Sequence, residues 1–139
     1  MGTPLRDVSS REVSELPEDG SKVFYFSGAI ASDVSSGDEV VVRGPVDLDR
    51  HGLIPLTFRS RDTQEPMTRE GLTLLVVEED GVAIPERRLN IVSIRLLEQL
   101  KPLLASGGYL KEHVGIKAEG KPPKTRYGLF FPDRTAAIV

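Results

Sequence analysis

Residues 71–84, which read GLTLLVVEEDGVAI, constrain the fold more than any other stretch of this chain. The first half is a continuous apolar run, as expected for a strand that packs into a core. Asp80-Gly81 follows, and this pair accommodates the positive φ values of a type I′ turn. A short return strand then ends at Pro85. The segment therefore predicts a tight β-hairpin.

Further regions have the composition of strands. The first, residues 23–26, is aromatic and β-branched. The second, residues 39–44, holds three consecutive valines, which indicate burial on both faces or an edge that another element covers. The third contains Pro55, which indicates an edge strand or a bulge because proline cannot donate to a strand ladder. The last two lie in the C-terminal tail. In order, these regions are 23–26, 39–44, 53–60, 113–118 and 126–131.

One helix is predicted at about 93–105. Ser93 suits the N-cap position, and Gly107-Gly108 suits the end of the helix. Pro102 removes a backbone hydrogen bond and therefore predicts a kink or a division of the helix. Leucines recur at three- and four-residue steps and so share one face: Leu96, Leu97, Leu100, Leu103 and Leu104.

This order of elements predicts an α+β domain with a mostly antiparallel sheet, either packed on the helix or partly closed as a small β-barrel. A late helix is also typical of an OB-type barrel, where it lies between the third and fourth strands. The length of 139 residues is that of one domain, which we assign to residues 21–139. Residues 1–20 carry two arginines and five acidic residues, and we expect them to form a flexible acidic arm.

The composition excludes several classes of site. The chain has no cysteine, which excludes disulfides, thiolate nucleophiles and cysteine-ligated metal centres. The G-x-x-x-x-G-K-[ST] and G-x-G-x-x-G phosphate-binding patterns are missing, and we predict no cofactor. No run of about 18 apolar residues is present, so no membrane span is expected. The N-terminus has no apolar core segment of a secretory signal, which indicates a cytoplasmic protein.

The sequence DLDRHG comes closest to a metal or catalytic motif. Four of its residues occupy the first, third, fifth and sixth positions of a calcium loop: Asp47, Asp49, His51 and Gly52. His51 replaces an oxygen ligand, and Phe58 stands where the bidentate glutamate belongs. The same residues are consistent with a hairpin turn that has a left-handed Gly52. They are also consistent with a histidine–carboxylate pair in a small hydrolase or metal-dependent enzyme.

A basic strip near the C-terminus is a candidate for anion binding. Its cations could follow a phosphate backbone while the tyrosine stacks on bases, as in the loop between the last two strands of OB-type barrels. The low aromatic content and the net negative charge of the chain favour the other interpretation, a solvated hairpin loop stiffened by prolines. The candidate contact residues of this 117–127 loop are Lys117, Lys121, Lys124, Arg126 and Tyr127.

Together these features favour a non-enzymatic cytoplasmic module that acts through protein–protein contacts, with a protein partner or by self-association. The support is a set of apolar strands that could pair at an exposed edge, together with one amphipathic helix. Two alternatives stay open. One is an OB-like domain that binds single-stranded nucleic acid through the 117–127 loop. The other is a small enzyme built around Asp47, Asp49 and His51.

Overall fold

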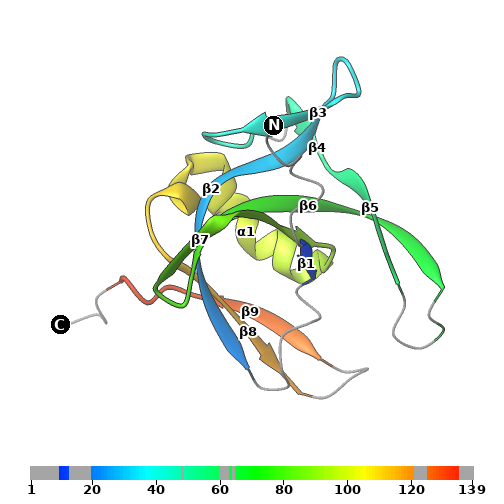
Figure 1. The fold of residues 1–139 in the computed structure, drawn as a ribbon. Helices are drawn as coiled ribbons and strands as arrows, with labels where there is room; N and C mark the ends of the chain where they lie inside the picture. The colour runs from blue at the N-terminus through cyan, green and yellow to red at the C-terminus, as the bar shows by residue number, and fades with distance from the viewer. Residues whose placement is uncertain are drawn as a thin grey trace.

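The computed structural model of the protein describes residues 10–12, 20–47, 49–59, 63, 65–120 and 125–134. Strands dominate this part of the chain, with one α-helix and a short 3₁₀ turn after it (Figure 1). In chain order the elements are β1 (Ser10–Glu12), β2 (Ser21–Asp33), β3 (Glu39–Val42), β4 (His51–Gly52), β5 (Ile54–Arg59), β6 (Pro66–Glu79), β7 (Val82–Ile91), α1 (Ile94–Ser106), η3 (Gly108–Leu110), β8 (Val114–Glu119) and β9 (Arg126–Phe130).

The main sheet has the strand order β1-β7-β6-β2-β8-β9. Every pair along this path is antiparallel except β1 and β7, which are parallel. β3 and β4 pair with the C-terminal half of β2, and β5 pairs with β6. α1 lies against one face of the sheet (Figure 1). The predicted α+β fold, with a mostly antiparallel sheet and one main helix, is confirmed.

The sheet is open, so the predicted barrel, including its OB-type form, is wrong. Among the described strands, β1 and β9 stand at opposite ends of the sheet and do not pair. A side chain of α1 occupies the outer edge of β9 instead. Gln99 Nε2 donates to Tyr127 O at 3.4 Å, and Gln99 Oε1 accepts the Leu129 N–H at 3.1 Å. The helix therefore satisfies an edge that closure of a barrel would leave for another strand.

The main core lies between α1 and the sheet. Alternate residues of the central strands point toward the helix, as the two-residue period of a strand requires. Full burial of such side chains contributes roughly 1.5 to 3 kcal/mol each. The largest side chains of this core that are fully buried are Phe24, Phe26, Leu74, Leu89, Ile91, Leu96, Leu100, Tyr109 and Ile116.

The helix begins and ends close to the predicted positions. Ser93 Oγ accepts the Leu96 N–H at 3.3 Å, and Gly107 has a φ of 78° at the C-cap. The helix continues through Pro102, so the predicted division is wrong. Pro102 is exposed, so water can replace the backbone hydrogen bond that proline removes. α1, the α-helix in the described part of the chain, is too short to cross a membrane.

The strand predictions have mixed outcomes. The hairpin is confirmed, because Asp80 and Gly81 have φ values of 50° and 83°, as a type I′ turn requires. The edge position predicted from Pro55 is also confirmed, since β5 pairs with β6 alone among the described strands. For the three valines, burial on both faces is wrong. Among the described strands β3 pairs with β2 alone, Val41 is 46% exposed, and Val42 packs against the main core.

Part of the predicted N-terminal arm is described. Ser10–Glu12 forms β1 and pairs with β7, with Ser10 opposite Arg88 and Glu12 opposite Asn90. Apart from β1 and Gly20, the predicted arm at 1–20 lies outside the described residues. Its flexibility stays a prediction.

Candidate binding groove

The candidate site begins where β5, β6 and the end of β7 meet at Gly71. A Cβ atom at Gly71 would lie 2.3 Å from Ile91 O and 2.8 Å from Leu56 Cδ1, which is closer than real side chains come. Glycine therefore allows this close approach of backbone and side chain. The approach buries a second, smaller apolar cluster, made of Ile30, Ile54, Leu56 and Leu75.

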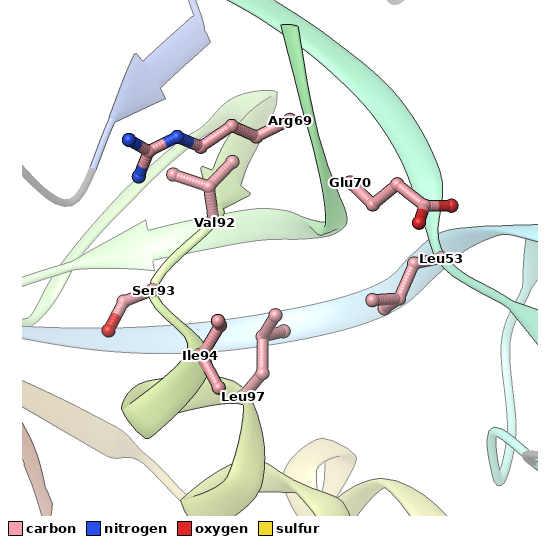
Figure 2. Close-up of a pocket in the computed structure, with 7 residues that line it drawn as sticks. All are labelled: Leu53, Arg69, Glu70, Val92, Ser93, Ile94 and Leu97. Atoms are coloured by element: carbon pink, nitrogen blue, oxygen red, sulfur yellow. The ribbon is translucent and has the colours of Figure 1, made fainter.

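A pocket of about 510 Å³ opens between this junction and the first turn of α1 (Figure 2). Four apolar and three polar side chains line it: Leu53, Val92, Ile94 and Leu97, with Arg69, Glu70 and Ser93. Figure 2 shows Leu53 and Glu70 on one side of the space, Val92 on the other, and Ile94 and Leu97 below. Ile94 is 74% exposed and Leu53 is 39% exposed. The pocket thus leaves apolar side chains in contact with solvent.

A smaller pocket of about 110 Å³ adjoins the first, and the two share Leu53 and Leu97. His51 and Gly52 of β4 also line the smaller pocket. The helix contributes one stripe of side chains to the two pockets, at three- and four-residue steps that share one side of a helix: Ile94, Leu97, Lys101 and Leu104. The two pockets together are called the α1 groove below.

Three charged side chains line the α1 groove, and all three are exposed: Arg69, Glu70 and Lys101. None of the three forms an ion pair with another described residue. Several charges elsewhere are paired within the chain, as in Lys22 Nζ with Glu79 Oε1 at 2.9 Å. The groove therefore combines exposed apolar surface with charges that are available to a partner.

The DLDRHG stretch, by contrast, folds as a local turn. The N–H groups of Arg50 and His51 donate to Asp47 O at 2.9 and 2.7 Å. Asp47 Oδ1 accepts the Asp49 N–H at 2.9 Å, and His51 Nδ1 accepts the Asp47 N–H at 3.0 Å. Within the described ranges, no three His, Asp or Glu side chains are grouped to hold a metal ion. Gly52 lacks the positive φ that was predicted for it, so that part of the prediction is wrong.

The basic strip is described in part, because two of its lysines lie outside the described residues: Lys121 and Lys124. Lys117 is exposed on β8, and its Nζ lies 3.2 Å from Glu119 Oε1. Arg126 is exposed at the start of β9. Tyr127 is half-buried and packs against the main core, which limits the ring surface available for base stacking. Contact with nucleic acid stays a prediction.

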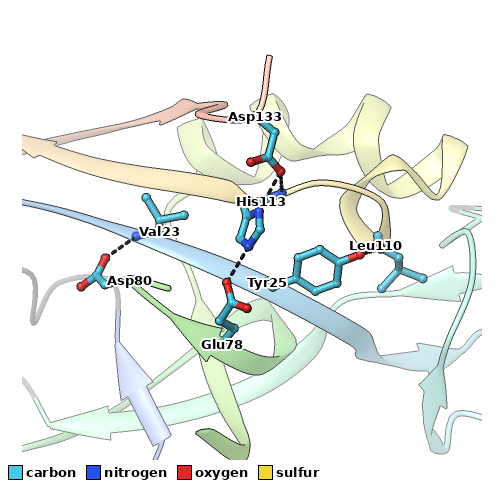
Figure 3. A network of polar contacts seen from close by, with 7 residues as sticks. All are labelled: Val23, Tyr25, Glu78, Asp80, Leu110, His113 and Asp133. Atoms are coloured by element: carbon cyan, nitrogen blue, oxygen red, sulfur yellow. Dashed lines mark hydrogen bonds and ion pairs between the residues drawn. The ribbon is translucent and has the colours of Figure 1, made fainter. Parts of the chain in front are cut away.

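A polar cluster around His113 lies apart from the groove and joins β6 to the C-terminal segment (Figure 3). His113 Nδ1 lies 2.7 Å from Asp133 Oδ2, and His113 Nε2 lies 2.5 Å from Glu78 Oε2. The same oxygen of Asp133 accepts the His113 backbone N–H at 2.7 Å. The Tyr25 ring meets the imidazole edge to face, with ring centroids 5.0 Å apart. His113, Glu78 and Asp133 are called the His113 clasp below.

The two carboxylates set the charge of this imidazole. Hydrogen bonding to Asp133 is the main cause that raises the pKa of His113 above its ordinary value of 6.5, and Glu78 adds to it against the opposing effect of burial. The backbone N–H and the ring of His113 in turn lower the pKa of Asp133 below 3.8. A protonated imidazole with both nitrogens engaged has no lone pair to act as a general base. The clasp is therefore suited to holding segments together.

Sequence reasoning missed both the groove and the clasp. The leucine period placed Leu97 among the core residues, whereas it is half-buried and lines the groove. Ile94 was one signal available in the sequence, since it lies outside the leucine stripe at the start of the helix. His113 offered no such signal, because the residues that it contacts, Glu78 and Asp133, are distant along the chain.

Comparisons with known proteins give no assignment: no family model, no curated protein and no solved structure matches this chain. Among the described residues, the α1 groove brings together two of the exposed large apolar side chains and three charges without an ion pair.

Proposed function

We propose that this protein is a non-enzymatic cytoplasmic binding module that receives a segment of a protein partner in the α1 groove. The segment carries two aliphatic side chains, which enter the two pockets, and an acidic residue that lies beside Lys101. The observation that carries the proposal is the open pocket of about 510 Å³ with Ile94, 74% exposed, in its lining.

The distribution of exposed apolar side chains supports this choice of surface. Five large apolar side chains are exposed among the described residues, and two of them, Leu53 and Ile94, line the same pocket. Ile94 is the first residue of α1, where an acidic residue would stabilise the helix through its dipole. Its apolar character therefore has a better explanation in contact with a partner than in helix formation. Burial of such a side chain would contribute roughly 1.5 to 3 kcal/mol.

The dimensions of the groove suggest how the partner segment is spaced. Ile94 and Lys101 lie on the same side of α1 and are about 10 Å apart along its axis at 1.5 Å per residue. About three residues of an extended chain, or about two turns of a helix, cover this length. The two aliphatic anchors of the partner are therefore a few residues apart, with the larger one over the pocket beside Ile94.

Charge gives the segment its direction. Lys101 lines the smaller pocket, and Arg69 and Glu70 line the larger one. The smaller pocket thus has a cation without a nearby acid in its lining, whereas the larger pocket has one charge of each sign. A carboxylate beside Lys101 would fix the orientation of the segment and steer its approach more than it would raise the affinity.

Selection of peptides from a random display library on the immobilised wild-type chain tests the proposal. Enriched peptides are expected to share two aliphatic residues and a nearby Asp or Glu. Ile94→Ser is expected to weaken their binding by roughly fivefold or more, since anchor residues at interfaces contribute over about 1 kcal/mol. Lys101→Glu is expected to weaken binding as well, with a loss that shrinks as salt is added.

Two matched variants serve as controls. Val82→Ser removes an apolar side chain that is 64% exposed, but from the β6–β7 hairpin. Lys111→Glu reverses an exposed lysine outside the groove. Both controls are expected to bind the peptides as the wild type does. Failure to enrich peptides, or peptides that bind the Ile94 variant unchanged, would contradict the proposal.

The remaining alternatives are distinguished in the same set of experiments. Light scattering that reveals a dimer lost on Ile94→Ser would assign the groove to a second copy of the chain in place of another protein. Binding of single-stranded DNA that weakens steeply with salt, and weakens further on Arg126→Glu, would favour the nucleic-acid function.

A further inference from the structure

We propose that the His113 clasp is a pH-operated latch, which holds residues 131–134 against β6 and β8 while the imidazole is protonated and releases them when it loses a proton. The three groups come from separate parts of the chain: the end of β6, the residue before β8, and the turn after β9 (Figure 3). None of them lines the α1 groove, so the latch does not depend on the proposed function.

The proposed latch depends on how many ring protons His113 needs in order to bind both carboxylates. Both ring nitrogens of His113 face carboxylate oxygens, which are acceptors when ionised. Two N–H donors are required, and an imidazole has two only when it is protonated. A neutral ring keeps one N–H and turns a lone pair toward the other carboxylate.

The contacts also indicate which side opens. Among the described residues, the imidazole Nε2 is the hydrogen-bond donor to the Glu78 carboxylate. Asp133 Oδ2 has a second donor, the backbone N–H of His113, at 2.7 Å. The neutral ring therefore keeps its proton on Nε2 for Glu78, and its Nδ1 lone pair then faces Asp133 Oδ2 at 2.7 Å. Repulsion between these two atoms loosens Asp133 rather than Glu78.

Among the described residues, the charged partners of the imidazole are both carboxylates, and no cation there could take over its role. From β2 it meets the uncharged Tyr25 ring, whose hydroxyl donates to Leu110 O at 2.8 Å. From β6 it meets Glu78, and from the C-terminal turn it meets Asp133. Loss of the imidazolium therefore leaves two carboxylates on either side of a neutral ring.

The nearest arginine of the C-terminal turn is already engaged. Arg134 Nε and Nη2 lie 3.0 and 2.9 Å from the carboxylate oxygens of Glu112, and the guanidinium lies 3.9 Å above the centre of the Phe131 ring. This ion pair does not involve His113 and still tethers the turn, so the release is a local loosening of residues 131–134 around Asp133 rather than their detachment. Phe131, which packs against the main core, becomes more exposed when the turn loosens.

The direction of the pH effect follows from the pKa shifts of His113 and Asp133. The pKa of His113 is raised above 6.5, so the clasp is fully formed below 6.5 and is lost as pH rises through the higher folded value. The pKa of Asp133 is lowered below 3.8, so Asp133 stays ionised until the solution is strongly acidic. The latch therefore closes in mildly acidic solution and opens as the solution becomes alkaline.

NMR of the ring-labelled protein tests the latch directly, because the chain has two histidines and so few ring signals to assign. Between about pH 5 and about pH 9, His113 is expected to titrate above the ordinary histidine value of 6.5. Above its midpoint, the ring proton is expected on Nε2. Exchange of the Phe131, Asp133 and Arg134 amides, corrected for intrinsic rates, is expected to rise several-fold. The Val23 amide, held by Asp80 Oδ1 at 2.9 Å, is expected to stay protected.

Variants separate the latch from a merely structural contact. Asp133→Asn is expected to lower the His113 midpoint by about one pH unit or more, since it removes a charge at hydrogen-bond distance. His51→Gln is expected to leave that midpoint unchanged. A wild-type His113 that titrates at or below 6.5, or protection at residues 131–134 that does not change as His113 titrates, would overturn the proposal without recourse to any variant.

Discussion

The α1 groove and the His113 clasp are two surface regions that differ in whether their side chains have partners within the chain. In the clasp, both ring nitrogens of His113 and the facing carboxylates are satisfied by one another. In the groove, Ile94 is 74% exposed, and Lys101 has no ion-pair partner among the described residues. The difference separates a surface that stabilises this chain from a surface that is available to another molecule.

The same contrast exists within α1, where neighbouring apolar residues have opposite environments. Leu96 is fully buried in the main core, whereas Ile94 faces solvent at the mouth of the groove. Folding explains Leu96 completely. It does not explain Ile94, and this excess of apolar surface over what folding requires is the basis for the proposed binding function.

The largest expected effect is on the free energy of unfolding, and it compares the buried Leu96 with the exposed Ile94. Leu96→Ala is expected to lower the free energy of unfolding by about 2 to 5 kcal/mol, because it leaves a cavity in the core. Ile94→Ala is expected to change it by less than about 0.5 kcal/mol, as for an ordinary surface position. Urea unfolding of both variants measures the difference. A comparable loss in both would mean that Ile94 belongs to the folded core rather than to a binding surface.

A smaller effect is expected at the junction that builds the groove. Gly71→Ala would push a Cβ atom against Ile91 O and Leu56 Cδ1, and overpacking of this kind costs about 1 to 3 kcal/mol. Gly44→Ala is the matched control, because no atom lies within 4 Å of its added Cβ. Thermal unfolding is expected to separate the two variants, with peptide binding impaired for Gly71→Ala alone. Equal melting temperatures would show that the junction tolerates a side chain.

The smallest expected effect concerns the clasp. Stability is expected to fall as pH rises above 6.5, because the raised pKa of His113 favours folding only while the ring is protonated. The loss is modest, since the clasp is partly exposed and solvent screens its charges. Glu78→Gln is expected to flatten this part of the pH profile, and His51→Gln is expected to leave it intact. Denaturant midpoints at a series of pH values provide the comparison.

The sequence predicted those parts of the fold that depend on neighbouring residues. Asp80-Gly81 marked the hairpin, and Ser93 and Gly107 marked the ends of α1, because turn and capping preferences act over a few residues. Pro55 marked an edge strand for the same reason, since a missing N–H is a local property.

The features that the sequence did not predict depend on distant residues. The barrel was excluded by contacts of Gln99 with β9, about thirty residues further along the chain. The clasp joins His113 to Glu78, which is 35 residues away, and to Asp133, which is 20 residues away. The groove needs Leu53 and Ile94 on facing elements. No local period or spacing encodes such meetings, because they depend on how the strands are ordered in the sheet.

The most direct test of the central claim is a map of amide shifts in the labelled wild-type chain on addition of the strongest peptide from the display selection. The account predicts shifts at His51, Leu53, Arg69, Ile94 and Lys101, with those of the His113 clasp unchanged. Shifts concentrated at Lys117, Arg126 and the C-terminal turn, with the α1 groove unchanged, would contradict it.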